Sequence, residues 1–484
     1  LGDVYKRTDS KIAVGLDIGT TKIVALVGKK NDNGKIEILG YGHAPSLGVH
    51  RGVVNNITQT INSIKLAVSQ AEAMSGIKIE EVTVGIAGQH IRSLQHSDYI
   101  TRLNAEEVID EEDLRLLINQ VYKLVMLPGE EIIHVLPQEY KVDNEDEIEE
   151  PIGMYGSRLE ANFHVVIGQV ASIRNIARCV KNAGLRLSGI TLEPLASSNA
   201  ALSPEEKEAG VALVDIGGGT TDIAVFKDNV IRHTSVIPFG GNVISEDIKT
   251  GCSIIGRQAE LLKERYGSAW PGENKETEIV SIPGLKGRGS KEISLKRLSQ
   301  IINARVQEIF EQVFLELKNY GCEEQNSKLI AGIVLTGGGS KLKHIRQLTE
   351  YITGMDVRIG YSNEHIVGAK AEELSGPEYA TAVGLLMKGI EELENKQMKE
   401  LYANPMTENI IGSMSKDSSS DQTLNLSKAE TENKEKHQNK EEEKEDELMG
   451  VKLGSKVKSS EKPKKSNIFS KWTDKFIQMI NETE

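Results

Sequence analysis

Two distant segments of the chain share one pattern of apolar and polar positions. Each contains an apolar run, the tripeptide Asp-Ile-Gly, further glycines or threonines, and a second apolar run: IAVGLDIGTTKIVALV at Ile12–Val27 and VALVDIGGGTTDIAVF at Val211–Phe226. β-Branched runs favour strands, and glycines permit a turn that a Cβ would block. The pattern therefore predicts two units, each made of a strand, a tight turn and a second strand.

Each unit carries an aspartate, Asp17 or Asp215, near the end of its first strand. The backbone N–H groups of a glycine-rich turn bind anions well, and a carboxylate that faces a phosphate requires a cation between them. The two turns together are therefore expected to hold the phosphates of a nucleotide with Mg²⁺. A single unit could equally be an ordinary Gly-Thr hairpin, and it is the repetition that favours phosphate binding.

Three further segments carry candidate site residues. The sequence IVLTGGGSKL at Ile333–Leu342 predicts a strand, a glycine turn and the start of a helix, where the backbone can approach a ligand closely. Glu193 follows an apolar run and precedes Pro194 in a small-residue helix, so it could orient a water molecule or simply be a surface acid. Glu260 and Lys263 share a helix face, either as ligand-binding residues or as an ordinary helical ion pair.

Composition excludes several other kinds of site. The chain has no Walker signature and no G-x-G-x-x-G turn, and its ten histidines show no metal-ligand spacing. The formal charge of −13 argues against nucleic acid as a partner. The three cysteines, Cys179, Cys252 and Cys322, fit buried thiols in a reducing compartment. We expect neither a cleavable signal nor a transmembrane helix, and the lack of an initiating Met suggests that residues precede Leu1.

Domain organisation changes near the end of the chain. Strand-like and helix-like segments alternate from Ile12 to about Lys388, as expected for an α/β protein, and EYATAVGLLMKGIEELENKQMKELY then predicts a long helix. Residues 403–465 contain few large apolar side chains and many charges. Such a sequence cannot bury enough apolar surface to offset the entropy of ordering, so we predict a disordered linker, with a solvated helix as the alternative.

Residues 466–484, SNIFSKWTDKFIQMINETE, regain large apolar side chains and predict an amphipathic helix with Asn467 as its N-cap. Lys462, Lys464 and Lys465 precede it and favour anionic headgroups. We expect the helix to lie in a membrane interface, whereas docking on the protein core is the alternative. Its apolar face would consist of Ile468, Phe469, Trp472, Phe476, Met479 and Ile480, and its polar face of Lys471, Asp474, Gln478 and Asn481.

Five motifs occur along the chain in the order DIGTTK, LEPLASSNAA, DIGGGTTDIA, LTGGGS and EYATAVGLL. In this order they resemble the two phosphate loops, the two interdomain connections and the adenosine loop of the actin/Hsp70/sugar-kinase ATPase superfamily. The segments AGQHIRSLQHSDYI, LPGEEIIHVLPQEYKVD and PIGMYGSRLEANFHVVIG resemble the small subdomain inserted in the FtsA family of bacterial cell-division proteins. The resemblance covers roughly Lys11 to Glu400, and the acidic linker contains no recognisable motif.

The resemblance implies an α/β fold of the actin-like ATPase type, with two lobes around a nucleotide cleft and an FtsA-type inserted subdomain. The first lobe would comprise residues 11–84, 165–205 and 379–402, and the insert residues 85–164. The core of the second lobe would comprise residues 206–242 and 333–378, and its outer subdomain, expected to bind FtsZ, residues 243–332. The linker (403–465) and the amphipathic membrane helix (466–484) would follow.

The resemblance also implies roles for individual residues in binding ATP and Mg²⁺. Glu193 would position the attacking water, and Asp17 and Asp215 would hold Mg²⁺ largely through water, with Asp215 taking part in catalysis. The phosphates would be held by Gly19, Thr20, Thr21 and Lys22 of the first turn and by Gly217, Gly218, Gly219, Thr220 and Thr221 of the second. Gly337, Gly338 and Gly339 would pass under the adenosine, and Glu260 and Lys263 would reach its ribose or base.

The implied function is that of a self-polymerising, ATP-binding scaffold that is at most a weak ATPase. It would tether FtsZ filaments, through their C-terminal tails, to the cytoplasmic face of the inner membrane at the division septum. Its partners would be FtsZ, further copies of itself, an anionic membrane surface and other division proteins, but no nucleic acid. A small-molecule kinase and a PilM-like pilus assembly ATPase are alternatives with the same fold, although neither explains a long tether that ends in an amphipathic helix.

Overall fold

The structure, a computed structural model, describes residues 12–394 except 276, 285, 287–288, 323–327, 363 and 369. The chain divides into a unit of residues 1–419 and a unit of residues 420–484, and every described residue belongs to the first. The predicted linker (403–465) and the predicted amphipathic helix (466–484) lie outside the described residues. Among the helices that are described, none is long and apolar enough to cross a bilayer.

The first sheet contains the first of the two repeated units as an antiparallel hairpin. Its strand order is β11-β6-β1-β2-β3-β19, in which β1, β6 and β11 run parallel to one another. Alternate residues of β1 and β2 point to opposite faces, and both faces are buried, which explains the uninterrupted apolar runs. The strands are β1 (Ile12–Ile18), β2 (Lys22–Lys30), β3 (Ile36–Pro45), β6 (Glu81–Ile86), β11 (Arg186–Leu192) and β19 (Ile366–Val367).

The second sheet contains the second unit, also as an antiparallel hairpin. Its order, β14-β13-β12-β17-β18, matches β3-β2-β1-β6-β11 of the first sheet in both sequence and direction of strands. The repeated sequence pattern therefore reflects two sheets built to the same plan. The strands are β12 (Val211–Ile216), β13 (Thr221–Lys227), β14 (Val230–Ile237), β17 (Ile333–Thr336) and β18 (Val357–Ile359).

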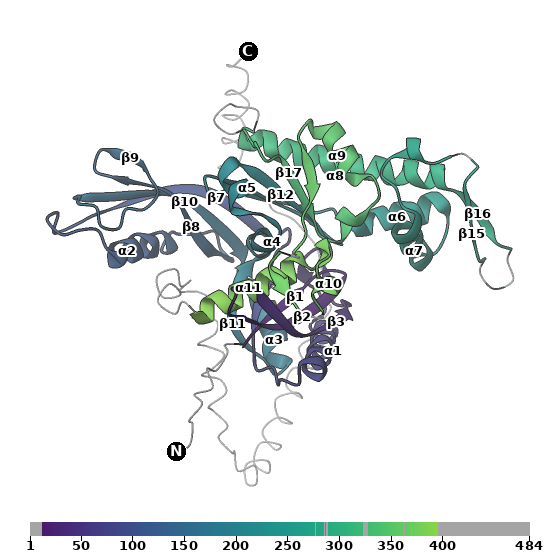
Figure 1. Ribbon diagram of the computed structural model, residues 1–484, viewed down its shortest axis with the longest axis horizontal. Helices are drawn as coiled ribbons and strands as arrows, with labels where there is room; N and C mark the ends of the chain where they lie inside the picture. Colours follow the sequence, from purple (N-terminus) through teal and green to yellow (C-terminus); the bar gives the residue numbers. More distant parts are fainter. Residues whose placement is uncertain are drawn as a thin grey trace, which may run out of the picture. The chain divides into compact units, whose positions relative to one another are not determined.

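Two helices, α4 (Glu193–Ala201) and α11 (Ala380–Glu394), lie between the sheets (Figure 1). One continuous apolar cluster joins Leu26 of the first sheet, Leu213 of the second, and Val383 of α11. The outer face of the first sheet packs on α1 (Ile57–Ser75) and α3 (Val170–Asn182). The outer face of the second packs on α6 (Gly241–Cys252), α8 (Leu295–Tyr320) and α9 (Ile345–Thr353).

A separate four-stranded sheet, ordered β7-β10-β8-β9, lies between β6 and α3 in the chain. It is covered by α2 (Glu111–Tyr122), whose first turn is capped by Asp110, and its core includes Leu117 and Phe163. The expected insert boundaries at residues 85 and 164 fall inside β6 and β10. The strands are β7 (Ile91–Thr101), β8 (Glu130–Val142), β9 (Glu145–Ile148) and β10 (Arg158–Gln169).

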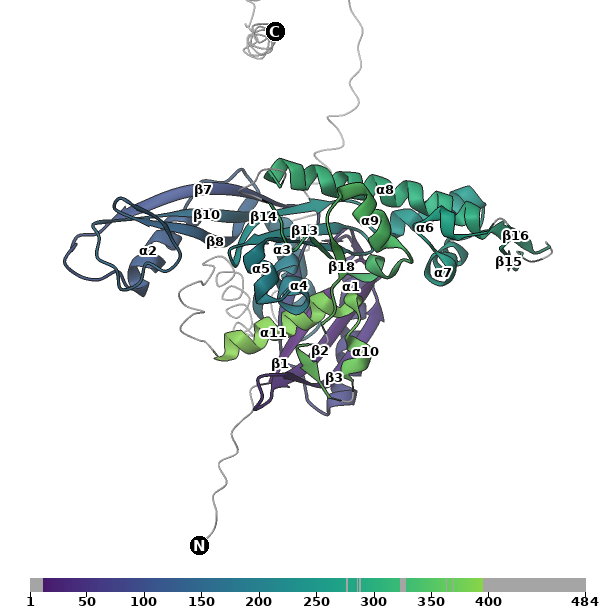
Figure 2. The same ribbon diagram turned by 45° about the horizontal axis from the view of Figure 1, so that its top comes forward.

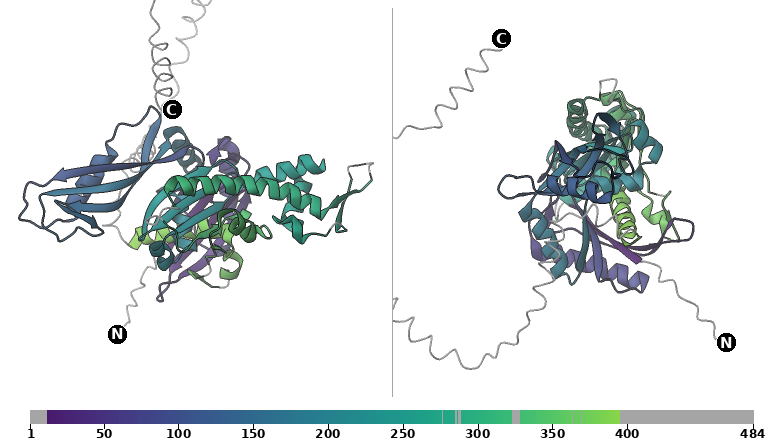
Figure 3. Two further views of the ribbon diagram at one scale, coloured as in Figure 1. Left: turned by 90° about the horizontal axis from the view of Figure 1, so that it is seen from above. Right: turned by 90° about the vertical axis from the view of Figure 1, so that its left-hand side faces the viewer.

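The outer part of the second lobe is mainly helical and lies on the opposite side of the core from the four-stranded sheet (Figures 2 and 3). It contains α6, α7 (Gly256–Tyr266), η1 (Pro271–Glu273) and α8, with the hairpin of β15 (Ile279–Ile282) and β16 (Lys291–Ser294). The short elements elsewhere are β4 (Val49–His50), β5 (Val53–Val54), α5 (Pro204–Ala209), η3 (Gly338–Lys341), α10 (Ala371–Leu374) and η4 (Pro377–Tyr379). All three cysteines are buried free thiols, as the sequence predicts.

Candidate functional site

The turns of the two repeated hairpins meet between the lobes. A Cβ on Gly219 would lie 2.7 Å from Thr20 Oγ1, and a Cβ on Gly218 would clash with Thr21 Oγ1. Glycine is therefore required for the second turn to approach the first this closely. The structure thus brings together the candidate residues of Gly19–Lys22 and Gly217–Thr221, which are almost 200 residues apart in the chain.

Four carboxyl groups gather beside these turns. Burial raises the pKa of Asp17 to about 7, and the neighbouring Asp215 contributes to the rise while Lys22 opposes it. Burial also raises the pKa of Asp222 to about 7, with a further contribution from Asp215. The pKa of Glu193 is raised well above its usual range by burial and then by the charges of the three aspartates. These side chains are close enough to oppose one another's ionisation.

Local structure explains how each carboxyl is positioned. Glu193 begins α4 with Pro194 beside it, as the sequence predicts, and a Cβ on Gly85 of β6 would lie 2.6 Å from its Cγ. Asp215 and Asp222 are cross-strand partners in the β12–β13 hairpin. Thr381 of α11 donates a hydrogen bond to Asp215 Oδ2 at 3.1 Å. The site therefore draws its carboxyl groups from both lobes and from one of the helices between them.

Asp222 has one satisfied and one unsatisfied oxygen. Thr220 Oγ1 donates to its Oδ2 at 2.9 Å, whereas the buried Oδ1 has no hydrogen-bond partner among the described residues. A buried carboxylate oxygen without a donor is costly, so this atom fits a ligand such as a water molecule of a hydrated cation. No three His, Cys, Asp or Glu residues within the described part of the chain are arranged to bind a metal directly. The carboxyl cluster therefore suits a cation that keeps its own waters.

Lys22 supplies positive charge at the same place. Its ammonium lies 3.8 Å from the centroid of the Tyr379 ring, and burial lowers its pKa although Asp17 raises it. A half-buried lysine at the end of a Gly-Thr-Thr turn is suited to binding phosphate. Lys22 and Asp222 occupy the same place after the Thr-Thr pair of their respective hairpins.

The candidate residues for the adenosine lie on the second-lobe side of the turns. Gly337 has a φ of 79°, and a Cβ there would clash with Asp215 Oδ1. Lys263 Nζ lies 2.8 Å from Glu260 Oε1 and donates to the Gly241 carbonyl at 2.9 Å, so the predicted pair shares a helix face and is joined as an ion pair. The Gly337–Gly339 segment leads into a short 3₁₀-helix, η3, rather than directly into an α-helix.

Sequence reasoning missed Asp222, Thr381 and Ser197, which surround Asp215. Asp222 was detectable in principle, because a charged residue stands between the second turn and the apolar run that follows it. Thr381 and Ser197 lie on two helices and carry no comparable signal.

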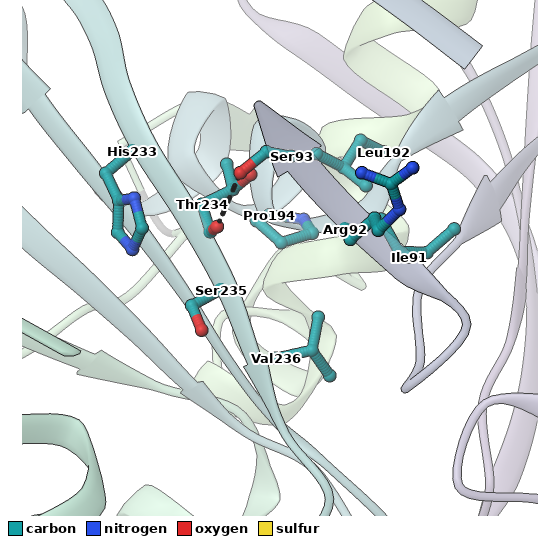
Figure 4. Close-up of a pocket in the computed structure, with 9 residues that line it drawn as sticks. All are labelled: Ile91, Arg92, Ser93, Leu192, Pro194, His233, Thr234, Ser235 and Val236. Carbon is teal, nitrogen blue, oxygen red and sulfur yellow. Dashed lines mark hydrogen bonds between the residues drawn. The ribbon is translucent and has the colours of Figure 1, made fainter. Parts of the chain in front are cut away.

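A cavity of about 260 Å³ lies apart from these residues, between β7, the start of α4 and β14 (Figure 4). Ser93 Oγ donates to the Thr234 carbonyl at 3.0 Å across this junction. The inserted sheet therefore touches the second lobe, although the chain places it within the first. The cavity is lined by Ile91, Arg92, Ser93, Leu192, Pro194, His233, Thr234, Ser235 and Val236.

Two sheets of the same plan, with a hairpin turn from each facing the other, define a protein of the actin-like ATPase fold. Among solved structures, the PilM–PilN type IV pilus biogenesis complex contains a chain with a TM-score of 0.54 and 17% identity, which covers 78% of this chain and 98% of that chain. At that identity the likeness concerns the fold alone.

Family models identify the chain more closely. The model described as "Cell division protein FtsA" matches residues 212–384, and "SHS2 domain inserted in FTSA" matches residues 88–167. The chain is 41% identical to the cell division protein FtsA of Pseudomonas aeruginosa over 381 residues, 79% of this chain and 90% of that protein. It is 35% identical to that of Escherichia coli strain K12 over 393 residues, 80% of this chain and 92% of that protein. The chain belongs to the FtsA family of cell division proteins, which confirms the resemblance seen in its motifs.

Proposed function

We propose that the cleft binds ATP with Mg²⁺. The observation that supports this most directly is the meeting of two glycine-rich turns beside four carboxyl groups and Lys22. The first turn, Gly19–Lys22, and the second, Gly217–Thr221, hold the phosphates through backbone N–H groups. Asp17 and Asp215 hold hydrated Mg²⁺, and the unsatisfied oxygen of Asp222 accepts a hydrogen bond from one of its waters.

The adenosine lies over Gly337, Gly338 and Gly339, and Glu260 and Lys263 contact its ribose or base. In support, the backbone at Gly338 is open to close approach, because the nearest atom to a Cβ there would be 4.0 Å away, whereas Gly337 and Gly339 pack closely on the end of β12. The Glu260–Lys263 pair is held by the start of α6, which is itself hydrogen-bonded to the second phosphate turn. The start of α6 therefore connects the residues proposed for the adenosine with those proposed for the phosphates.

Glu193 orients water for attack on the terminal phosphate, and hydrolysis is slow. Burial and then three neighbouring aspartates raise the pKa of its carboxyl well above the usual range, so they disfavour the ionised form, which is the form that can accept a proton. Bound Mg²⁺ offsets part of this repulsion. At most a weak ATPase is therefore expected, in keeping with a scaffold.

Calorimetry with Mg-ATP tests the site. Asp215→Ala is expected to abolish Mg-dependent binding, because it removes a carboxylate that both lobes face. Asp32→Ala, at an exposed loop position, is the matched control and is expected to bind normally. Unchanged affinity in Asp215→Ala would show that the nucleotide lies elsewhere.

We further propose that the protein polymerises and links FtsZ to the cytoplasmic face of the inner membrane at the division septum. Membership of the FtsA family supports this role, and other division proteins are recruited to the same assembly. The C-terminal tail of FtsZ binds the outer part of the second lobe, residues 243–332. The inserted sheet takes part in head-to-tail contacts between copies, and residues 466–484 bind an anionic membrane.

Negative-stain microscopy of the protein on anionic lipid with ATP tests this role, with filaments as the expected result. A variant in which residues 89–168 are replaced by a short linker tests the insert, because these limits spare β6. The variant is expected to lose filaments while retaining ATP binding. Filaments identical to those of the intact protein would exclude the insert from the contact.

A further inference from the structure

The turn between β4 and β5, formed by Arg51 and Gly52, contacts both phosphate turns. The Gly52 N–H donates to Thr20 Oγ1 of the first turn at 3.1 Å. A Cβ on Gly219 of the second turn would lie 2.9 Å from Arg51 Cα and 3.0 Å from its N atom. This two-residue turn of the first lobe therefore lies where the two lobes meet at the phosphate end of the cleft.

Arg51 has a backbone conformation that is unfavourable for its residue type. Its φ is 50°, in the left-handed region that glycine adopts without cost. An arginine at such a position gives up roughly 1 kcal/mol of stability relative to glycine. With Gly52 at a φ of 74°, both residues have the positive φ that a two-residue β-hairpin turn requires, so the hairpin accounts for this conformation and places Arg51 in the turn itself.

The guanidinium group of Arg51 has no carboxylate partner among the described residues. It lies 6.0 Å from the centroid of the Phe239 ring, in the second lobe just before α6. Other cations near the cleft are already paired: Lys263 with Glu260 at 2.8 Å and Lys341 with Glu378 at 2.6 Å. Arg51 is thus a half-exposed cation beside the phosphate turns that is not committed to an ion pair.

The charge at the site makes a further cation useful. The triphosphate alone brings more negative charge than Mg²⁺ and Lys22 can neutralise, and each carboxyl that is ionised adds to it. Each additional phosphate group of the nucleotide increases the excess. An arginine binds phosphate with two parallel N–H donors, and its charge persists at every relevant pH.

The same turn also contacts the start of the inserted subdomain. A Cβ on Gly52 would lie 2.6 Å from the Ala87 carbonyl oxygen and 2.7 Å from Gly88 Cα. The family model of the insert begins at residue 88. A displacement of the Arg51–Gly52 turn would therefore shift Ala87 and Gly88, where the insert joins the first lobe.

From these contacts we propose that Arg51 binds the terminal phosphate of the nucleotide and so distinguishes a triphosphate from a diphosphate. The Arg51–Gly52 turn transmits the presence of that phosphate to the base of the inserted sheet. This inference rests on the proposed binding of ATP in the cleft.

Binding of Mg-ATP and Mg-ADP by calorimetry tests the inference. Arg51→Ala removes the side chain, and Arg51→Gly removes it while suiting the φ of 50°, so the second variant folds even if the first does not. In both, the affinity for ATP is expected to fall about tenfold or more, with the affinity for ADP changed less than about twofold. Lys263→Ala is the control, and it is expected to weaken both nucleotides equally because it contacts adenosine.

The possible results separate this inference from the proposed function. If the unaltered protein binds neither nucleotide, the ATP site itself is wrong. If it binds ATP and Arg51→Gly leaves the ratio of ATP to ADP affinity unchanged, only the role of Arg51 is wrong. If the unaltered protein binds ATP and ADP with equal affinity, the proposed role of Arg51 in distinguishing them is also wrong.

Hydrogen exchange tests the transmission. In the unaltered protein, replacing ADP by ATP is expected to change exchange at residues 87–91, and Arg51→Gly at saturating nucleotide is expected to abolish the difference. A difference that persists in the variant would exclude the turn as the connection.

Discussion

His164 Nε2 of the inserted sheet lies 2.9 Å from Thr234 Oγ1 of β14, and both side chains are buried. This hydrogen bond is part of a set that joins the insert to the edge strand of the second lobe. Ser93, Gln95 and Gln138 all donate side-chain hydrogen bonds to backbone carbonyls of β14. An edge strand that would otherwise be open is thus covered within the molecule, and the insert is fastened to the lobe that does not contain it in sequence.

Removing the hydroxyl of Thr234 is expected to destabilise the protein. Thr234→Val keeps the shape but leaves a buried imidazole nitrogen without its partner, which costs about 1–3 kcal/mol. Thermal denaturation measures the loss as a lower melting temperature. Thr101→Val, at the exposed end of β7, is the matched control and is expected to change stability by less than about 0.5 kcal/mol. Equal effects of the two substitutions would mean that the His164–Thr234 bond contributes nothing.

The same histidine predicts a dependence on pH. Burial, and then the nearby charge of His233, lower the pKa of His164 to about 4 from a usual 6.5. The unfolded chain therefore takes up a proton at higher pH than the folded protein does. Stability from this group is fully present above about pH 6.5 and is lost as the pH falls toward 4.

Melting temperatures of the unaltered protein and of His164→Gln, measured from pH 7 to pH 5, check this dependence. The carboxyl cluster has raised pKa values and acts in the opposite direction, so the comparison between the two proteins isolates the histidine. Between pH 7 and pH 5, the free energy of unfolding of the unaltered protein is expected to fall by about 2 kcal/mol more than that of the variant. Parallel curves would contradict the prediction.

Neutralising Asp222 is expected to stabilise the ligand-free protein and weaken ligand binding. Asp222→Asn can still accept the hydrogen bond from Thr220, but it removes a charge that burial and Asp215 oppose. We expect the free energy of unfolding to rise by about 1–3 kcal/mol at neutral pH in the absence of nucleotide. The affinity for Mg-ATP is expected to fall about 10–100-fold.

Denaturation and calorimetry on Asp222→Asn measure the two effects. The exposed Asp32→Asn is the matched control for both. A variant that binds Mg-ATP normally would remove Asp222 from the site, and one that is less stable without nucleotide would refute the repulsion within the cluster.

The amphipathic pattern of residues 466–484, which lie outside the described residues, predicts membrane binding. Glu in place of Trp472 and Phe476 puts two charges on the apolar face, where a fully buried side chain contributes roughly 1.5–3 kcal/mol. Co-sedimentation with anionic liposomes is expected to fall about tenfold or more, with ATP binding intact.

The matched control adds the same charge to the polar face, through Gln478→Glu and Asn481→Glu. It is expected to reduce sedimentation far less, because those positions remain in water. If the Trp472 and Phe476 variant still sediments with lipid, the anchor lies elsewhere.

The sequence by itself determined the local units of this protein. Continuous apolar runs around Asp17 and Asp215 required buried strands, and the glycines between the runs required tight turns. Glu193 followed by Pro194 specified the start of α4, and the spacing of Glu260 and Lys263 placed both on one face of α7. These features depend on neighbours within a few residues, which is why the pattern of residues was enough to predict them.

Only the tertiary structure decided which of these units face one another. The four carboxyl groups come from β1, β12, β13 and α4. The Arg51–Gly52 turn, which carries no motif, contacts the turns of both repeated hairpins. Burial and hydrogen bonding fix these contacts, and both depend on how the two sheets pack on α4 and α11. The bond from His164 to Thr234 is of the same kind. It joins segments 70 residues apart in the chain, so the sequence of neither strand predicts which strand it contacts.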